Sequence, residues 1–275
     1  MSVNRVPGFL PSTSGLHFSN SYPDNTDYPF VELPVVKRII SADAGNGICG
    51  GFVYTVLDLF LAKPRLQPPP NATRPDPGTP RFTYLVERLL DSLGKHRGWD
   101  NAIKAIEWTQ ISGHDVELPL SPHGLAHRMV YDEWPKIKSD IDSGTPSPLM
   151  LVMAPQCGPA DIVGIKVALG RSHQVLAYAY RLDGDNLELS IYDCNDPDND
   201  SSTLELNISQ PEHTIEITAS AMRAKSPIRG LFRSEYSFNY PTPFKYADQS
   251  YLPPLLLFSY SMVSLDLSYL VPLLL

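Results

Sequence analysis

The spacing of apolar residues changes near Gly144, and this change constrains the fold more than any other feature of the sequence. Before it, apolar residues recur at helical spacing, which predicts a helix that begins near Cys49 and further helices in residues 81–93, 102–108 and 121–144. After it, β-branched and aromatic runs predict strands in residues 148–155, 173–182, 187–194 and 203–208. Helices followed by strands joined through short turns predict an α+β fold, with a helical half and an antiparallel sheet half.

The rest of the chain predicts three segments of different character. Residues 1–40 are rich in Pro, Ser and Asn and are expected to be irregular, with one strand-like run at 31–40. One domain is expected over residues 41–250, interrupted by a proline-rich connector at 63–80 that excludes a helix or a central strand there. The apolar C-terminal segment, residues 251–275, approaches the length that spans a bilayer.

Asp266 and Pro272 argue against a membrane anchor in that last segment, because a carboxylate in a bilayer is costly. We therefore favour a segment that packs on the domain, or a loosely ordered end, over membrane contact through residues 251–275. The first residues have no apolar signal-peptide core. The compartment stays unassigned, with the cytoplasm as the default.

Composition argues against several functions. The net charge of −8 and the lack of a Lys/Arg run argue against nucleic acid as a partner. Three cysteines in 275 residues do not form a disulfide framework. His123 and His127 share a helix face at i and i+4, but the sequence shows no third ligand beside them. The acidic loop 193–200 lacks the pattern of a calcium loop, so we expect no metal and no cofactor.

Cys49 follows a glycine-rich turn and opens an apolar helix. The N–H groups and dipole at a helix start stabilise a thiolate, which makes Cys49 a candidate nucleophile. Asn46 fits a capping turn, and Gly50 and Gly51 would leave the thiol uncovered and let the backbone approach a substrate. The Cys49 N–H is a candidate oxyanion donor. The alternative is a buried cysteine that only fills space.

The other two cysteines, Cys157 and Cys194, are expected to be structural. Strand alternation predicts that Cys194 points away from its neighbour Asp193.

His173 opens one predicted strand and Asp193 ends the next. The turn at Asp183–Asn186 predicts a hairpin, in which the start of one strand faces the end of the other. The two side chains are therefore expected side by side, as the base and the orienting acid for Cys49.

These motifs, in this order, resemble the papain-like cysteine peptidase superfamily, and its C39-like branch in particular. The resemblance is carried by the helix-start Cys-Gly pair, the stop at Gly144–Pro146, the strand His173–Tyr180 and Asp193. It implies a papain-like fold, in which a helical half led by the nucleophile helix packs on an antiparallel sheet half. It also implies a thiol hydrolase that cleaves amide bonds of a peptide or protein substrate.

Two positions depart from the pattern of that superfamily. Asp43 stands six residues before Cys49, where the superfamily usually has an oxyanion-binding Gln, and Asn46 is the nearer amide. Asn195 is an alternative to Asp193 as the residue that orients His173. A catalytically inactive papain-like module that binds a peptide or partner protein is therefore the alternative function.

Overall fold

The computed structural model describes residues 1–23, 26, 47–116, 123–153, 156–158, 170, 172–220 and 227–245. Its helical elements are α1 (Pro11–Ser14), α3 (Cys49–Leu61), α4 (Pro80–Ser92), a 3-10 turn (Lys95–Arg97), α5 (Asp100–Gln110), α6 (Leu125–Arg128), a π-helical turn (Met129–Glu133), α7 (Trp134–Asp142) and a last 3-10 turn (Thr242–Phe244). Its strands are β1 (Ser2–Arg5), β2 (Ser147–Val152), β3 (His173–Asp183), β4 (Asn186–Tyr192), β5 (Thr203–Asn207), β6 (Ile217–Ala219) and β7 (Gly230–Arg233).

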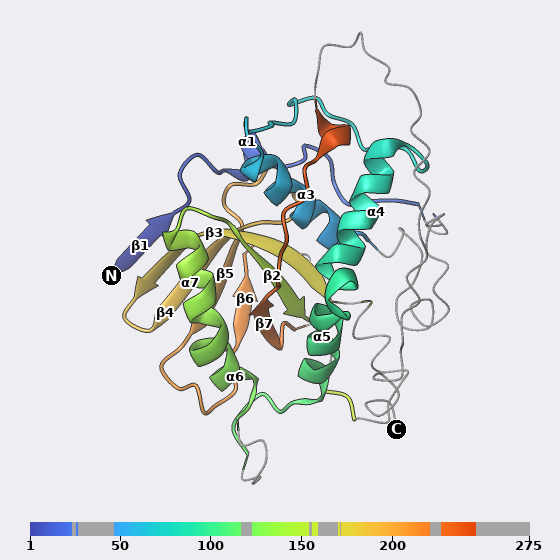
Figure 1. Ribbon diagram of the computed structural model, residues 1–275. Coiled ribbons are helices and arrows are strands. Elements are labelled where there is room, and N and C mark those ends of the chain that lie inside the picture. The colour runs from blue at the N-terminus through green and yellow to red at the C-terminus, as the bar shows by residue number, and fades with distance from the viewer. Residues whose placement is uncertain are drawn as a thin grey trace.

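The seven strands form one curled sheet, in which six follow the order β6-β5-β4-β3-β2-β7 and the seventh, β1, pairs with β3 (Figure 1). Each strand pairing in the described chain is antiparallel. β1 joins the edge of β3 beyond the part that pairs with β2. A bulge between Ala177 and Ala179 interrupts the register of β3 against β4, and a bulge of this kind increases the local twist.

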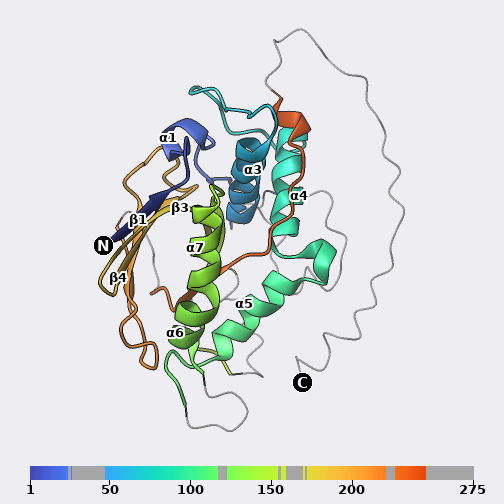
Figure 2. The ribbon, with the colours of Figure 1, turned by 60° about the vertical axis from the view of Figure 1, so that its left-hand side comes forward.

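The long helices lie together on one side of the sheet (Figure 2). α3 packs between α4 and β3, while α7 lies over β2, β3 and β7. The predicted α+β class is therefore confirmed, and the helices α3 to α7 precede the strands β2 to β7 as expected, although β1 precedes them all.

α3 is predominantly apolar, and every residue from Gly50 to Phe60 is buried, including the polar Thr55 and Asp58. A helix of this kind must be enclosed by other elements. It begins where the sequence predicts, at Cys49. The preceding Gly47 has a φ of +91°, a conformation that favours glycine, and Ile48 donates its N–H to Oδ1 of Asn20 at 2.9 Å.

Pro135 interrupts the helix expected over residues 121–144, as its missing N–H requires. The π-helical turn Met129–Glu133 separates α6 from α7, and Pro135 occupies the first turn of α7. The helix ends at Asp142, two residues before Gly144, which has a φ of +81°. The stop at Gly144 is thus confirmed, and it places β2 directly after it.

A buried ion pair fixes the orientation of α3. The carboxylate of Asp58 lies 2.7 Å from Nε of Arg88 on α4 and also accepts from the Tyr84 hydroxyl at 2.9 Å. The segment that follows β7 supplies two more donors, the Tyr236 hydroxyl at 2.6 Å and the Asn239 N–H at 2.9 Å. This carboxylate is well supplied with donors, as a buried charge must be.

The N-terminal segment corrects one expectation. Residues 1–40 were expected to be irregular, but Ser2–Arg5 forms β1, and Pro11–Ser14 forms α1. β1 carries no apolar pattern that would predict a strand, and it pairs with the part of β3 from Ala179 to Leu182. The strand-like run 31–40 lies outside the described residues, as does the apolar segment 251–275. Among the helices that the structure describes, none is both long and apolar enough to cross a bilayer.

Candidate functional site

The sulfur of Cys49 lies at the start of α3, and its residue is half-buried. Burial alone would raise the pKa of this thiol. A hydrogen bond with His173 and the charge of that imidazole, together with the N–H groups of Gln174 and Gly50, outweigh burial and lower the pKa from its ordinary value of 9.0. These contacts favour the thiolate form of Cys49, which is the nucleophilic form of a cysteine.

His173 is the first residue of β3, and Asp193 directly follows the last residue of β4. The two strands pair from Asp183 opposite Asn186 through Leu176 opposite Tyr192, so the predicted hairpin is confirmed. It brings Nε2 of His173 to 2.8 Å from Oδ1 of Asp193. Since Nε2 is engaged by the carboxylate, Nδ1 is the ring nitrogen left for Cys49.

The electrostatics of the three groups are coupled. Burial alone would lower the pKa of His173, but the hydrogen bonds and charges of Asp193 and Cys49 raise it to about 10. Burial would likewise raise the pKa of Asp193, but the contact with His173 and the Asn195 N–H hold it below its ordinary value. The lowered pKa of Cys49 and of Asp193 and the raised pKa of His173 each favour the charged form of the group.

The structure distinguishes between the two candidate orienting residues. The Asn195 side chain is exposed, and this residue reaches the site through its backbone, whose N–H donates to Oδ1 of Asp193 at 2.9 Å. Asp193 is the residue that contacts the imidazole. Asn195 fixes the carboxylate instead.

The role expected for Gly50 and Gly51 needs correction. Both are buried. A Cβ on Gly50 would lie 2.1 Å from Oγ of Ser92 and 2.4 Å from Nε2 of Gln174, while a Cβ on Gly51 would lie 2.1 Å from the Leu85 carbonyl oxygen. Their missing side chains let α3 approach α4 and β3 closely, rather than opening space for a substrate.

Cys194 also differs from expectation, because its sulfur does not point away from the site. One ligand atom each of His173, Asp193 and Cys194 lie within 4.8 Å of one another. β4 ends at Tyr192, so strand alternation no longer applies at Cys194. Burial raises the pKa of this thiol well above its ordinary value, so it stays protonated and is a poor metal ligand.

Two further residues, Asn20 and Gln174, hold the site together, and no local pattern in the sequence indicates this role. The amide of Asn20 accepts the Ile48 N–H through Oδ1, and its backbone N–H donates to the Cys194 carbonyl oxygen at 2.9 Å. Gln174 donates from Nε2 to Oγ of Ser92 at 2.9 Å, which joins β3 to α4 beside Gly50. The predicted oxyanion residue Asn46, like Asp43, lies outside the described residues.

Comparisons with family models, with curated proteins and with solved structures found no match to this chain.

Proposed function

We propose that this protein is a thiol hydrolase of papain-like architecture that cleaves amide bonds in a peptide or protein substrate. The observation that carries the proposal is the convergence of Cys49, His173 and Asp193 from three separate elements of the fold. A nucleophile, a base and a group that orients the base are the minimum that covalent acyl transfer requires.

The chemistry follows from the protonation states. The thiolate of Cys49, whose proton has moved to Nδ1 of His173, attacks the carbonyl carbon of the amide. Asp193 accepts the Nε2–H of the imidazolium and so keeps Nδ1 directed at the sulfur. His173 then protonates the departing amine, and a thioester remains on Cys49. A water molecule that gives its proton to His173 attacks the thioester and releases the acid.

The oxyanion formed during attack requires hydrogen-bond donors. The first N–H groups of a helix have no acceptor within the helix, and α3 begins at Cys49 itself. The Cys49 N–H is therefore our proposed oxyanion donor among the described residues, and it acts in line with the helix dipole.

Covalent labelling tests the nucleophile. The full-length protein is incubated at pH 6–7 with a peptide that carries a thiol-reactive group, and the labelled cysteine is located by peptide mass spectrometry. We expect Cys49 to be modified first, because its pKa is lowered from the ordinary value and the thiolate is the reactive form. Cys49→Ser should lose the fast phase, whereas Cys157→Ser should retain it. Labelling of Cys49 no faster than of Cys157 or Cys194 would overturn the proposal.

The sequence feature Asp43 favours a second candidate, an inactive papain-like module that binds a peptide or partner protein. A carboxylate at that position does not donate to an oxyanion unless it is protonated. A pool of peptides of diverse sequence, analysed by mass spectrometry after incubation with the protein, separates the two functions. Peptides that are bound but never cleaved, by a protein whose Cys49 labels rapidly, would favour the binding module.

A further inference from the structure

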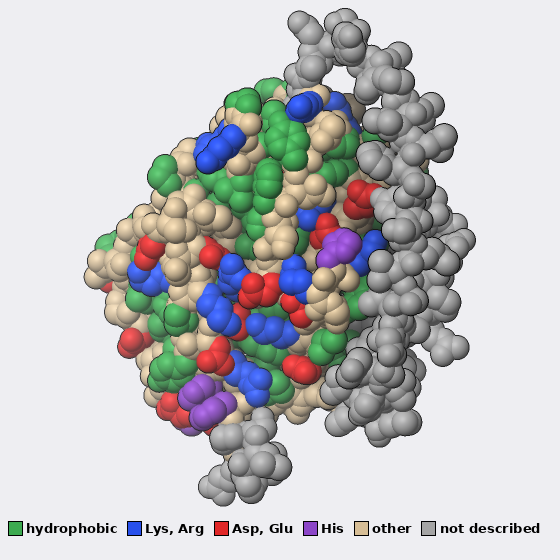
Figure 3. Space-filling view, viewed as in Figure 1, with side chains coloured by type: hydrophobic (Ala, Val, Ile, Leu, Met, Phe, Trp, Pro, Cys, Tyr) green, Lys and Arg blue, Asp and Glu red, His purple; other side chains and the backbone are tan. Residues whose placement is uncertain are grey.

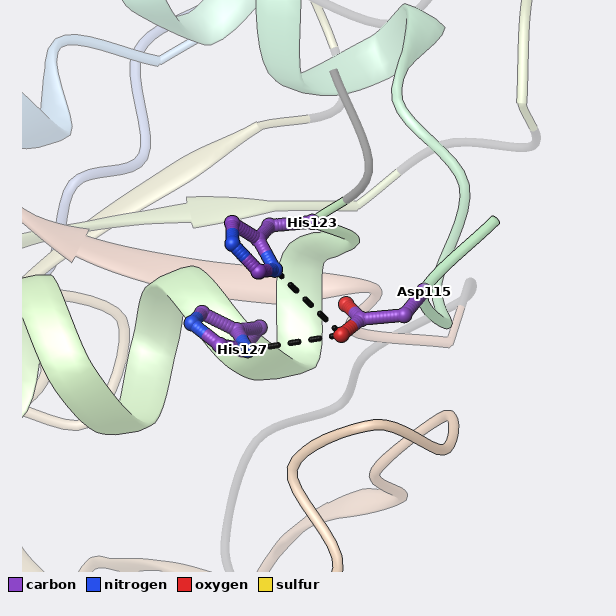
Figure 4. Close-up of side chains that lie close together, drawn as sticks. All are labelled: Asp115, His123 and His127. Carbon is purple, nitrogen blue, oxygen red and sulfur yellow. Dashed lines mark hydrogen bonds and ion pairs between the residues drawn. The ribbon is translucent and has the colours of Figure 1, made fainter. Parts of the chain in front are cut away.

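Three side chains that take no part in the Cys49 site meet at the surface beside α6 (Figure 4). Nδ1 of His123 lies 3.3 Å, and Nδ1 of His127 3.4 Å, from the same carboxylate oxygen, Oδ2 of Asp115. One ligand atom from each residue lies within 4.8 Å of the other two. The sequence showed no third metal-ligating residue beside the two histidines. Asp115, from the loop that follows α5, is the candidate for that position.

The carboxylate of Asp115 is held in place by its other oxygen. Oδ1 accepts the N–H of Gly124 at 2.7 Å, and the Asp115 N–H donates to the Glu212 carbonyl oxygen at 2.9 Å. A Cβ on Gly124 would lie 2.3 Å from the backbone of His114, so glycine is needed where this loop meets the start of α6. The arrangement directs Oδ2 at the two imidazoles, as the outer contacts of a metal ligand do.

The distances fit the edges of a metal coordination shell. Bonds of about 2.0–2.2 Å to nitrogen and oxygen, arranged tetrahedrally, place neighbouring ligand atoms about 3.3–3.6 Å apart. Both measured distances between imidazole nitrogen and carboxylate oxygen fall in that range.

The two imidazoles must turn to bind a common ion. Their rings are stacked, with centroids 3.7 Å apart and planes 18° from parallel, so their in-plane lone pairs do not yet converge. The side chains are 51% and 26% exposed, so neither ring is enclosed by protein on all sides. Histidine side chains beside acidic ones are visible at the surface over α6 (Figure 3), so solvent reaches the site directly.

We propose that Asp115, His123 and His127 form a site for a divalent transition-metal ion, with Zn²⁺ as the preferred ion and water as its fourth ligand. Two imidazoles and one carboxylate suit zinc, and an open fourth position is common in three-ligand sites. The ion would join the loop after α5 to the start of α6. This proposal does not depend on the function of Cys49.

The competing explanation needs no metal, because a protonated imidazole can form an ion pair with Asp115 alone. Titration of Zn²⁺ into the metal-free, full-length protein by isothermal calorimetry separates the two. Cys49→Ser is used as the background, so that the Cys49 thiolate does not capture the ion. We expect one Zn²⁺ per chain, and Co²⁺ in its place should give the visible absorption of a four-coordinate site.

Single substitutions assign the ligands. In that background, His127→Ala and Asp115→Asn should each weaken Zn²⁺ binding about 100-fold or more, by analogy with the 10–100-fold loss on removing a supporting contact. His96→Ala is the matched control, because His96 is exposed and lies 3.3 Å from a single carboxylate, that of Asp91. It should leave the affinity unchanged. Circular dichroism shows whether each variant is folded.

Two results would overturn the proposal. One is the absence of Zn²⁺ binding at micromolar concentrations by the folded protein. The other is binding that survives both His127→Ala and Asp115→Asn, which would place the ion elsewhere in the chain.

Discussion

His173 and Asp193 meet in the interior, 2.8 Å apart, whereas His123 and His127 meet Asp115 at the surface, 3.3 and 3.4 Å away. The residue types are the same, but the surroundings differ. At the buried pair, burial alone would lower the imidazole pKa, but the contacts with Asp193 and Cys49, which low solvent exposure strengthens, raise it to about 10. At the exposed cluster, water weakens the contacts but leaves the ligand atoms accessible. Burial thus favours proton chemistry, and exposure favours the capture of an ion from solution.

The largest expected effect concerns the buried carboxylate. Asp193→Asn should lower the proposed amide hydrolysis by about 10²–10⁴-fold, since an amide that donates to Nε2 favours the wrong imidazole tautomer. Steady-state cleavage of a peptide found in the pool assay measures this. Asp198→Asn, at an exposed carboxylate beside His17, is the control and should retain activity. Full activity in Asp193→Asn would remove Asp193 from the mechanism.

The second prediction concerns folding. His173→Ala leaves the buried carboxylate of Asp193 without its cation, which should cost about 3–5 kcal/mol in the free energy of unfolding. His127→Ala, measured in a chelator, should change stability little because its partner is solvated. Urea unfolding followed by circular dichroism checks both. Equal losses would mean that burial does not distinguish the two sites.

The third prediction concerns pH. The folded pKa of His173, about 10, exceeds the ordinary value of 6.5 that applies to the unfolded chain. Its stabilisation is therefore complete below about pH 6.5 and is lost as the pH rises toward 10. In Cys49→Ser the thiol no longer titrates with an opposite sign, but its part in raising the His173 pKa is also lost. Urea midpoints of this variant should still fall as the pH rises above about 6.5, over a window that ends below pH 10, because Asp193 still raises the His173 pKa. Adding His173→Gln should remove the slope, and a slope that persists would contradict the assignment.

The exposed cluster should respond at the opposite end of the pH scale. The Gly124 N–H, followed by the nearby imidazoles, lowers the pKa of Asp115 below its ordinary value of 3.8. The contribution of the Asp115 carboxylate to the free energy of unfolding is thus present above about pH 4, and it is lost as the pH falls through the lowered pKa. Asp115→Asn should flatten the acid limb of the stability curve without changing the alkaline limb.

The smallest expected effect tests the second orienting residue. Asn195→Ala keeps the N–H that donates to Asp193 and removes only an exposed side chain. Activity and stability should stay within about 0.5 kcal/mol of the parent protein, as for other surface substitutions. A loss comparable to that of Asp193→Asn would show that the Asn195 amide, rather than the carboxylate, orients the imidazole.

Local patterns in the sequence were enough to predict the elements that carry the Cys49 site. The glycine-rich turn before an apolar run located the start of α3 at Cys49, and the turn at Asp183–Asn186 paired β3 with β4. From the turn alone, His173 and Asp193 were expected side by side. Short-range signals suffice here because a hairpin fixes which strand ends meet.

Contacts between distant segments could not be predicted in this way. Asn20 and Cys194 are 174 positions apart in the sequence, yet the Asn20 N–H donates a hydrogen bond to the Cys194 carbonyl oxygen. Asp115 meets His127 only because the chain returns after α5, and nothing in a lone carboxylate indicates that return. β7 is four residues long and carries no alternating pattern, so its pairing with β2 is visible only in the folded sheet.

The segment that follows β7 has a consequence for where the protein can be cut. Tyr236 and Asn239 supply two of the donors to Asp58, and Arg88 reaches the Ser237 carbonyl oxygen at 2.7 Å. Cleavage of the backbone between Arg233 and Tyr236 would leave every described strand intact. It would, however, release the segment that supplies two hydrogen-bond donors to the buried carboxylate of Asp58. Limited proteolysis at that point should loosen α3, and with it the thiol at the opposite end of the same helix.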